Sequence, residues 1–288
     1  MNIPLRRWVG LGVLAAVAFL AFGFVIMFVT RTREQAAKVT CQNNLRALAL
    51  LGTPYTRGDS GLVLPAKNSK SAASVWAGTV MNDKLQPHQR LSWVVEALPM
   101  LLEPSVDTAK LLQSIDKSKA WEQSPNLEAS QRLLRTLQCP ASPVLPAPGQ
   151  PAVTMYVGIS GVGKNSALFP LTEPLSNRAG AFRYDSATPL AVISAHDGLS
   201  QTLLFGQTTS DLGPWMQGGL STVRGLEDIE GAKPLIGVGG QFGGTIAGGC
   251  WFALCDGSVR FFRTTTEPKV LYALATIAGG KTEFALDE

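Results

Sequence analysis

The chain has 288 residues, of which 45% are hydrophobic, so it can bury a substantial core and is not disordered throughout. Its formal net charge is only +4 and its Lys and Arg residues are dispersed, which argues against the basic surface that nucleic-acid binding requires. We therefore expect no nucleic-acid partner.

The segment Trp8–Thr30 carries no charge and no Pro. A helix of this length, at about 1.5 Å per residue, spans the roughly 30 Å hydrocarbon core of a bilayer. A cleaved signal peptide has a shorter apolar stretch followed by small residues, whereas Arg31, Thr32 and Arg33 follow here. We predict a retained single-pass transmembrane helix that contacts membrane lipid.

The charges flanking this segment do not settle its orientation. Arg6 and Arg7 precede it, while Arg31, Arg33 and Lys38 follow it, so the positive-inside counts are nearly balanced. The short stub of residues 1–7 favours a cytoplasmic N-terminus and an exported remainder, which the cysteines permit without requiring.

The helix is expected to continue outside the membrane over residues 31–52. This stretch lacks Pro and Gly before Gly52, and Cys41, Leu45 and Leu48 recur at the spacing of one helical face. Gly52 and the nearby Pro54 supply a C-terminal stop.

The remainder, residues 53–288, is expected to form an exported α+β domain, and the sequence leaves open whether it is one domain or two. Thr53–Ala73 is predicted to be a loop, and residues 140–151 a Pro-rich connector. Predicted helices are Leu91–Leu102, Asp107–Trp121, Asn126–Leu137 and Glu267–Ile277. Predicted strands, of an antiparallel sheet, are Val153–Ile159, Leu190–Ser194, Thr202–Gly206, Trp251–Leu254 and Ser258–Arg263.

The run from Gly158 to Lys164 imitates a phosphate-binding loop, with two Gly residues followed by Lys. Asn165 stands where Ser or Thr would hold magnesium, and Pro170 and Pro174 oppose the helix that should follow. An ordinary loop is the better interpretation, and we expect no cofactor.

A hydrolase site is also poorly supported. Ser160 lies in a Gly-x-Ser-x-Gly-like stretch, but Val162 replaces the final Gly. Of the two histidines, His88 and His196, the second precedes Asp197, which Asp-Gly turn chemistry explains better than a triad. No Cys or His spacing matches a zinc site, so we expect no catalytic residues and no metal.

The cysteines can pair in three ways. If 251–254 is a strand, Cys250 and Cys255 lie roughly 16 Å apart, beyond the limit of about 7 Å for bridged Cα atoms. Cys41 with Cys139 is the preferred pair, and the alternative is four buried thiols.

Several short landmarks follow one another along the chain. They are Cys41-Gln42-Asn43-Asn44-Leu45, Ser92-Trp93, Leu98–Glu103, Ile115-Asp116, Trp121, Asn126, Cys139-Pro140, Tyr156–Gly161, Asp197–Thr202, Pro214-Trp215 and Asp256–Phe261. In this order they resemble a pilin-like family abundant in planctomycete bacteria, domain of unknown function 1559, which carries a C-terminal His-x9-Asp-Gly signature.

The resemblance implies a long N-terminal helix, half in the membrane and half packed on an exported antiparallel sheet, as in type IV pilins and pseudopilins. It implies a single-pass protein of the bacterial inner membrane whose C-terminal domain is extracytoplasmic. The family positions, interpreted as structural, are Cys41, Asn43, Asn44, Trp93, Cys139, Asp197, Gly198, Trp215, Asp256 and Gly257.

The chain departs from this pattern at two places. Gly10 is followed by Leu11-Gly12-Val13-Leu14-Ala15, without the Phe-Thr-Leu and fifth-position Glu of a prepilin, which argues against prepilin-peptidase processing. Ile246 occupies the position of the signature His. For Asp256-Gly257 we expect a hairpin turn between two strands.

Three functions are weighed. The leading one is a non-enzymatic, pilin-like membrane protein, a minor or unprocessed subunit of a secretion or surface assembly that forms homo- or hetero-oligomers through its N-terminal helix. The alternative is a membrane-tethered domain that binds a surface ligand such as a polysaccharide through loops around Trp215 and Phe242. A hydrolase ranks third.

Overall fold

The computed structural model describes residues 5–52, 74–142, 144–172, 175–229, 231–244 and 246–280. Within residues 5–17 it describes the side chains of Leu14 and Ala16 only. The predicted loop Thr53–Ala73 and Pro174 therefore lie outside the described residues, as do residues 1–4 of the stub and several side chains of the expected span Trp8–Thr30.

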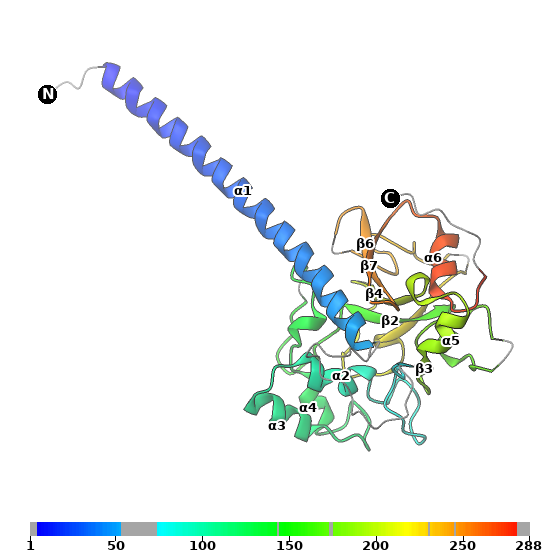
Figure 1. Ribbon diagram of the computed structural model, residues 1–288. Helices are drawn as coiled ribbons and strands as arrows, with labels where there is room; N and C mark the ends of the chain where they lie inside the picture. Colours follow the sequence, from blue (N-terminus) through cyan, green and yellow to red (C-terminus); the bar gives the residue numbers. More distant parts are fainter. Residues whose placement is uncertain are drawn as a thin grey trace, which may run out of the picture.

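The chain forms one long helix followed by an α+β domain (Figure 1). Its α-helices are α1 (Leu5–Gly52), α2 (Trp93–Leu101), α3 (Val106–Ser114), α4 (Asn126–Ser130), α5 (Leu190–Ala195) and α6 (Pro268–Ala275). Short 3-10 helices are η1 (Arg135–Leu137), η2 (Ser166–Leu168), η3 (Leu199–Gln201) and η4 (Gly219–Ser221). The strands are β1 (Ser74–Val75), β2 (Tyr156–Val162), β3 (Thr188–Pro189), β4 (Leu203–Gln207), β5 (Val223–Leu226), β6 (Gly249–Leu254) and β7 (Val259–Arg263).

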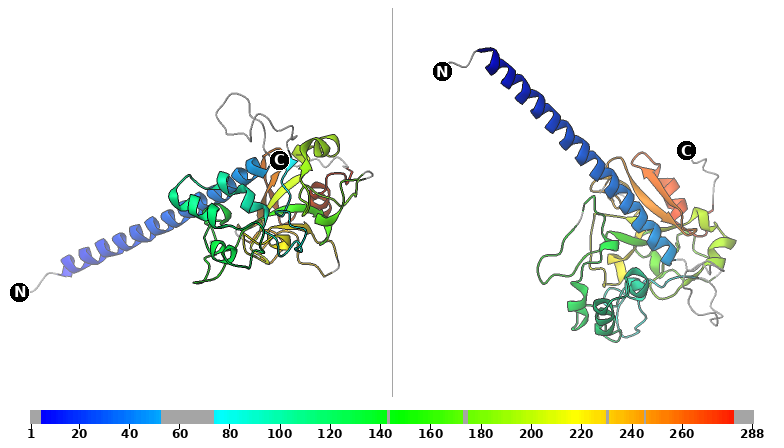
Figure 2. Two further views of the ribbon diagram at one scale, coloured as in Figure 1. Left: turned by 90° about the horizontal axis from the view of Figure 1, so that it is seen from below. Right: turned by 60° about the vertical axis from the view of Figure 1, so that its left-hand side comes forward.

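Helix α1 is a single rod of 48 residues, about 72 Å long. Its N-terminal half projects away from the domain, and its C-terminal half packs against it in every view (Figures 1 and 2). Cys41, Leu45, Leu48 and Ala49 are buried at helical spacing, as the sequence predicted. Among the helices whose residues the structure describes, none combines the length and apolarity of a membrane span.

The central sheet has five strands in the order β5-β2-β4-β6-β7. The pairs β2–β4, β4–β6 and β6–β7 are antiparallel, but β5 runs parallel to β2, so the expected all-antiparallel sheet is wrong at this edge. Strand β5 follows β4 in the chain but pairs with the opposite edge of β2. Strands β1 and β3 form a separate two-stranded sheet.

Both faces of the central sheet are covered, so β2 and β4 are buried on both sides, whereas the edge strand β7 has exposed residues. One core contains Trp93, Phe182 and Phe205, whose rings lie 5.0–5.9 Å apart, together with Leu45 and Leu48 of α1. A second core, on the other face, contains Phe242, Phe252 and Phe262 with Leu271 and Leu274 of α6. The domain is thus a three-layer arrangement with helices α1 and α2 on one side and α6 on the other.

Several local predictions need correction. Leu190–Ser194 was predicted as a strand but lies in α5, where Leu190 and Ile193 are buried one helical turn apart. The predicted helix Asp107–Trp121 ends at Ser114. Its continuation is a turn fixed by Asn126, whose side chain accepts from Asp116 N (2.8 Å) and donates to Ala120 O (3.1 Å).

The third predicted helix, Asn126–Leu137, is split into α4 and η1. The remaining predicted elements are present with small shifts of their ends: Leu91–Leu102 as α2, Glu267–Ile277 as α6, and four of the five predicted strands as β2, β4, β6 and β7.

Candidate functional site

The junction between α1 and the domain is locked by covalent and polar contacts. Cys41 and Cys139 form a disulfide with a Cα–Cα distance of 4.9 Å, which confirms the preferred pairing. Tyr156 Oη donates to Cys41 O (3.2 Å), and Asn44 Nδ2 donates to Gln138 O (3.0 Å). Burial raises the pKa of the Tyr156 phenol, so it remains a donor. Asn43, by contrast, lies on the exposed face of the helix.

The other two cysteines are buried and free, as expected for residues that cannot pair with each other. Burial raises the pKa of both the Cys250 and the Cys255 thiol well above the usual range. Both thus remain protonated at neutral pH and are poor nucleophiles.

The family tryptophans are core residues. Trp93 Nε1 donates to Thr222 O (3.2 Å), and Trp215 Nε1 donates to Arg132 O (3.0 Å). Ser92, which precedes Trp93, donates from its Oγ to Trp215 O (2.5 Å) and so links the segments that carry the two tryptophans. Trp215 and Phe242 are 0% and 1% exposed, so their own rings pack in the core and do not face solvent.

The two Asp-Gly pairs form turns. Gly198 has φ +87° and its N–H donates to Ile193 O (2.8 Å), while Asp197 Oδ2 accepts from Gly279 N (3.2 Å). Asp256-Gly257 joins β6 to β7, as predicted, with Gly257 at φ +83° and Asp256 Oδ1 accepting from Ser258 N (2.9 Å). In both pairs the Gly adopts a positive φ and the Asp carboxylate accepts a hydrogen bond from a backbone N–H, so both pairs have a structural role.

Ile246, at the position of the family's signature histidine, is 8% exposed. An apolar side chain that is almost fully buried contributes packing there and cannot take over the proton transfer or metal ligation of an imidazole.

The run from Gly158 to Lys164, which resembles a phosphate-binding loop in sequence, lies mostly in a strand. Residues 158–162 belong to β2, every residue of which is buried, and a Cβ on Gly158 would meet the Phe182 ring at 2.6 Å. Ser160 is buried, with its Oγ 2.7 Å from Ser166 Oγ. His196 lies on the surface with Nδ1 2.8 Å from Val192 O. None of these residues is arranged for phosphate binding or nucleophilic attack.

A cavity of about 660 Å³ lies beside the edge strand β5. Three segments form its walls: the chain after β4 from Asp211 to Pro214, the strand β5 with Arg224 and Gly225, and a Gly-rich segment that contains Lys233 and Gln241. The sequence singled out Lys164 and the loops around Trp215 and Phe242, which border this cavity, but it did not predict that they meet Arg224 and Glu227 there.

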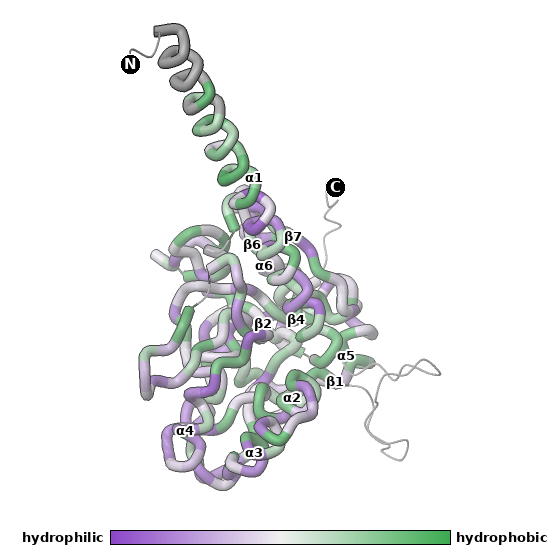
Figure 3. The backbone as a smooth tube through the Cα atoms, turned by 90° about the vertical axis from the view of Figure 1, so that its left-hand side faces the viewer, coloured by the Kyte–Doolittle hydropathy of each residue, from purple (hydrophilic) through white to green (hydrophobic). Residues whose placement is uncertain are grey.

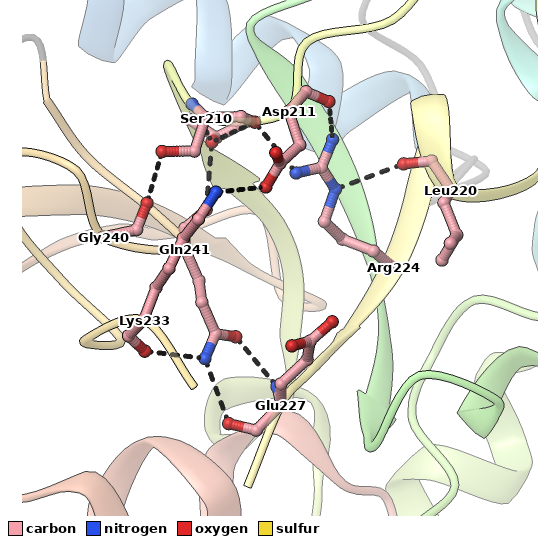
Figure 4. Close-up of polar contacts among 9 residues, drawn as sticks. Ser210, Asp211, Leu220, Arg224, Glu227, Lys233, Gly240 and Gln241 are labelled. Carbon is pink, nitrogen blue, oxygen red and sulfur yellow. Dashed lines mark hydrogen bonds and ion pairs between the residues drawn. The ribbon is translucent and has the colours of Figure 1, made fainter. Parts of the chain in front are cut away.

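Hydrogen bonds hold these walls together (Figure 4). Arg224 donates to three backbone carbonyls, those of Leu220 (3.2 Å), Ser210 (3.0 Å) and Asp211 (2.9 Å). The 7% exposed Gln241 accepts from Glu227 N (2.8 Å) and donates to the carbonyls of Glu227 (3.0 Å) and Lys233 (3.1 Å).

The charged residues of the cavity differ in whether they form an ion pair. Lys233 Nζ contacts Asp211 Oδ2 at 2.8 Å and thereby lowers the pKa of that carboxyl. Burial lowers the pKa of Arg224, which nevertheless stays cationic because an arginine pKa starts far above neutral. Among the described residues, neither Arg224 nor Glu227 takes part in an ion pair.

Comparisons with known proteins give one relation. Searches of curated proteins and of solved structures found no match. The family model described as "Protein of unknown function (DUF1559)" matches residues 30–235, which is more than half of the chain and includes α1 from Thr30 through β5. The match confirms the resemblance to domain of unknown function 1559, and it ends before Ile246 and Asp256. The chain therefore belongs to the DUF1559 family.

Proposed function

We propose that this chain is a non-enzymatic, pilin-like subunit of a bacterial secretion or surface assembly, anchored in the inner membrane through α1. In this proposal the projecting half of α1 lies in lipid and contacts the same helix of neighbouring copies or related subunits. The α+β domain lies outside the cytoplasm.

The exposed apolar surface of α1 is the observation that carries the proposal. Leu14, Phe19, Phe22, Phe24 and Phe28 are each at least 64% exposed, and they occur on all sides of the helix. Figure 3 shows this stretch as a hydrophobic rod that becomes hydrophilic as it approaches the domain. Apolar surface of this extent is unfavourable in water, so it requires lipid or other helices around it.

Charges at the end of this surface support the same placement. No charged residue occurs from Trp8 to Thr30, and then Arg31, Arg33 and Lys38 follow on the exposed helix. Cations of this kind at the end of a span reach the lipid headgroups while their stems stay in apolar surroundings.

The disulfide supports export of the domain. A structural disulfide persists in the periplasm or outside the cell and is rare in the cytosol. Because Cys41 lies on α1 and Cys139 in the domain, the bond also fixes the direction in which the helix leaves the domain.

Photo-crosslinking in membranes tests the assembly role. A photoreactive amino acid replaces Phe22 on the projecting helix, and the matched control replaces Leu168, which is 53% exposed on the domain. We expect membrane retention in alkaline carbonate for both variants and crosslinked oligomers for the Phe22 variant alone. Release into the soluble fraction would contradict the anchor, whereas retention without crosslinks would leave a monomeric anchor and refute the subunit role.

Mass spectrometry of the mature N-terminus separates two versions of the proposal. A terminus at Leu11, especially a methylated one, would mean prepilin-type processing despite the missing Glu. A terminus at Met1 or Asn2 would mean a permanent anchor and an unprocessed subunit.

A further inference from the structure

Two opposite charges face the cavity beside β5 without direct contact: Arg224 interacts through space with Glu227, as it does with Asp211. Arg224 and Glu227 both lie at its walls, and no ion pair joins them. In Figure 4 the Glu227 carboxylate points toward the side on which the Arg224 guanidinium lies.

The Arg224 guanidinium is held in position, and both groups retain binding capacity. A guanidinium has five N–H donors, and the three carbonyl contacts of Arg224 occupy three of them. The backbone of Glu227 is held by Gln241 and by Tyr272 Oη, which donates to Glu227 O (3.2 Å), while the carboxylate itself makes no hydrogen bond with a described residue. Because Arg224 is already held by these contacts, its side chain loses less conformational entropy when a ligand binds.

The rest of the lining sets the size and polarity of a ligand. Leu212, Pro214 and Leu220 form apolar parts of the wall. Lys164 adds a further cation at the exposed rim, besides Arg224 and the Asp211-paired Lys233. A volume of about 660 Å³ is typical of small-molecule sites and exceeds that of a single amino acid.

We propose that this cavity binds a small zwitterion, a free amino acid or short peptide with an apolar side chain. The ligand's carboxylate binds the free N–H groups of Arg224 with Lys164 nearby, and its ammonium group binds the Glu227 carboxylate. The apolar side chain packs against Leu220. This activity goes beyond anchoring and assembly and does not depend on them.

Calorimetric titration of the full chain in detergent tests the proposal. The probes are L-leucine, leucyl-leucine, N-acetyl-L-leucine, which lacks the ammonium, and L-leucinamide, which lacks the carboxylate. Each is titrated to roughly tenfold above a millimolar Kd. We expect a zwitterion to bind and each singly blocked analogue to bind about tenfold or more weakly, since each loses one charge-assisted contact.

Glu227→Gln is the decisive variant because it keeps the shape of the side chain and removes only its charge. It should weaken L-leucine or leucyl-leucine binding about tenfold and leave N-acetyl-L-leucine binding unchanged. Glu128→Gln, an equal charge change on the exposed face of α4, is the matched control and should bind as the parent does. An unchanged melting temperature of Glu227→Gln verifies folding.

Three results would overturn the proposal: no binding by either zwitterion, blocked analogues that bind as tightly as L-leucine, or Glu227→Gln binding that equals the parent's. Preference for L-leucine over leucyl-leucine, or the reverse, distinguishes an amino-acid site from a peptide site.

Discussion

Removal of the disulfide should strongly destabilise the domain. The bond closes a loop with a sequence separation of 98 residues between Cys41 and Cys139. In the chain-entropy model, a crosslink over about 100 residues lowers the entropy of the unfolded chain enough to contribute roughly 4.7 kcal/mol. Measured effects are often smaller, so we expect Cys41→Ala with Cys139→Ala to lower the free energy of unfolding by about 3–5 kcal/mol.

Urea denaturation followed by tryptophan fluorescence measures this effect in the detergent-solubilised chain, which has 6 Trp residues. The m-value should rise, because the unfolded chain without the crosslink is more expanded. Reductant should destabilise the parent to the level of the double variant and leave the double variant unchanged. A loss below about 1 kcal/mol would refute the entropic reasoning.

Three further predictions concern single residues. Asn126→Ala leaves the backbone groups of Asp116 and Ala120 without their buried partner and should cost about 2–4 kcal/mol in urea denaturation, whereas the exposed Asn43→Ala should stay within roughly 0.5 kcal/mol. Gly198→Ala should cost about 1–3 kcal/mol in the same assay, because φ +87° and ψ 153° strain any L side chain even though no atom lies within 4 Å of the new Cβ. Burial raises the pKa of Tyr184 to about 12 from 10.0, so its contribution to stability is complete below pH 10 and is lost as pH rises toward 12. Between pH 10 and 12 the free energy of unfolding of Tyr184→Phe should therefore fall less steeply than that of the parent, by about 1.4 kcal/mol per pH unit. Equal dependence on pH in both proteins would contradict the assignment.

Local patterns were enough to predict α1, the β6–β7 hairpin and the family. A 3.6-residue spacing of Cys41, Leu45 and Leu48 identifies a buried helix face without knowledge of its partner. Asp256-Gly257 between two β-forming runs encodes a hairpin within a few residues. Each of these signals lies within one short segment.

Other features depend on distant contacts. Leu190–Ser194 is a short apolar run with Val192 and Ile193, which suits a strand as well as a helix, and tertiary burial of Leu190 and Ile193 decides for the helix. Strand β5 was missed because its four residues, with Gly225 among them, gain their pairing only from β2 more than 60 residues away. The cavity was missed for the same reason, since Arg224 and Gln241 come to line one cavity only after the sheet forms.

The junction of α1 and the cavity share one loop, which predicts that they are energetically coupled. Leu212 packs against the Cys41–Cys139 cluster and also lines the cavity, while the neighbouring Asp211 O accepts from Arg224. Arg224→Gln and the double cysteine variant should consequently give non-additive losses of stability, with a coupling energy of about 0.5–3 kcal/mol in a double-mutant cycle. Asn126→Ala, which lies in neither contact set, is the control and should combine additively with Arg224→Gln. Additive losses for the first pair would show that the contacts of this loop with the disulfide and with Arg224 are energetically independent. Binding in the cavity could then not be transmitted to the anchor helix by this route.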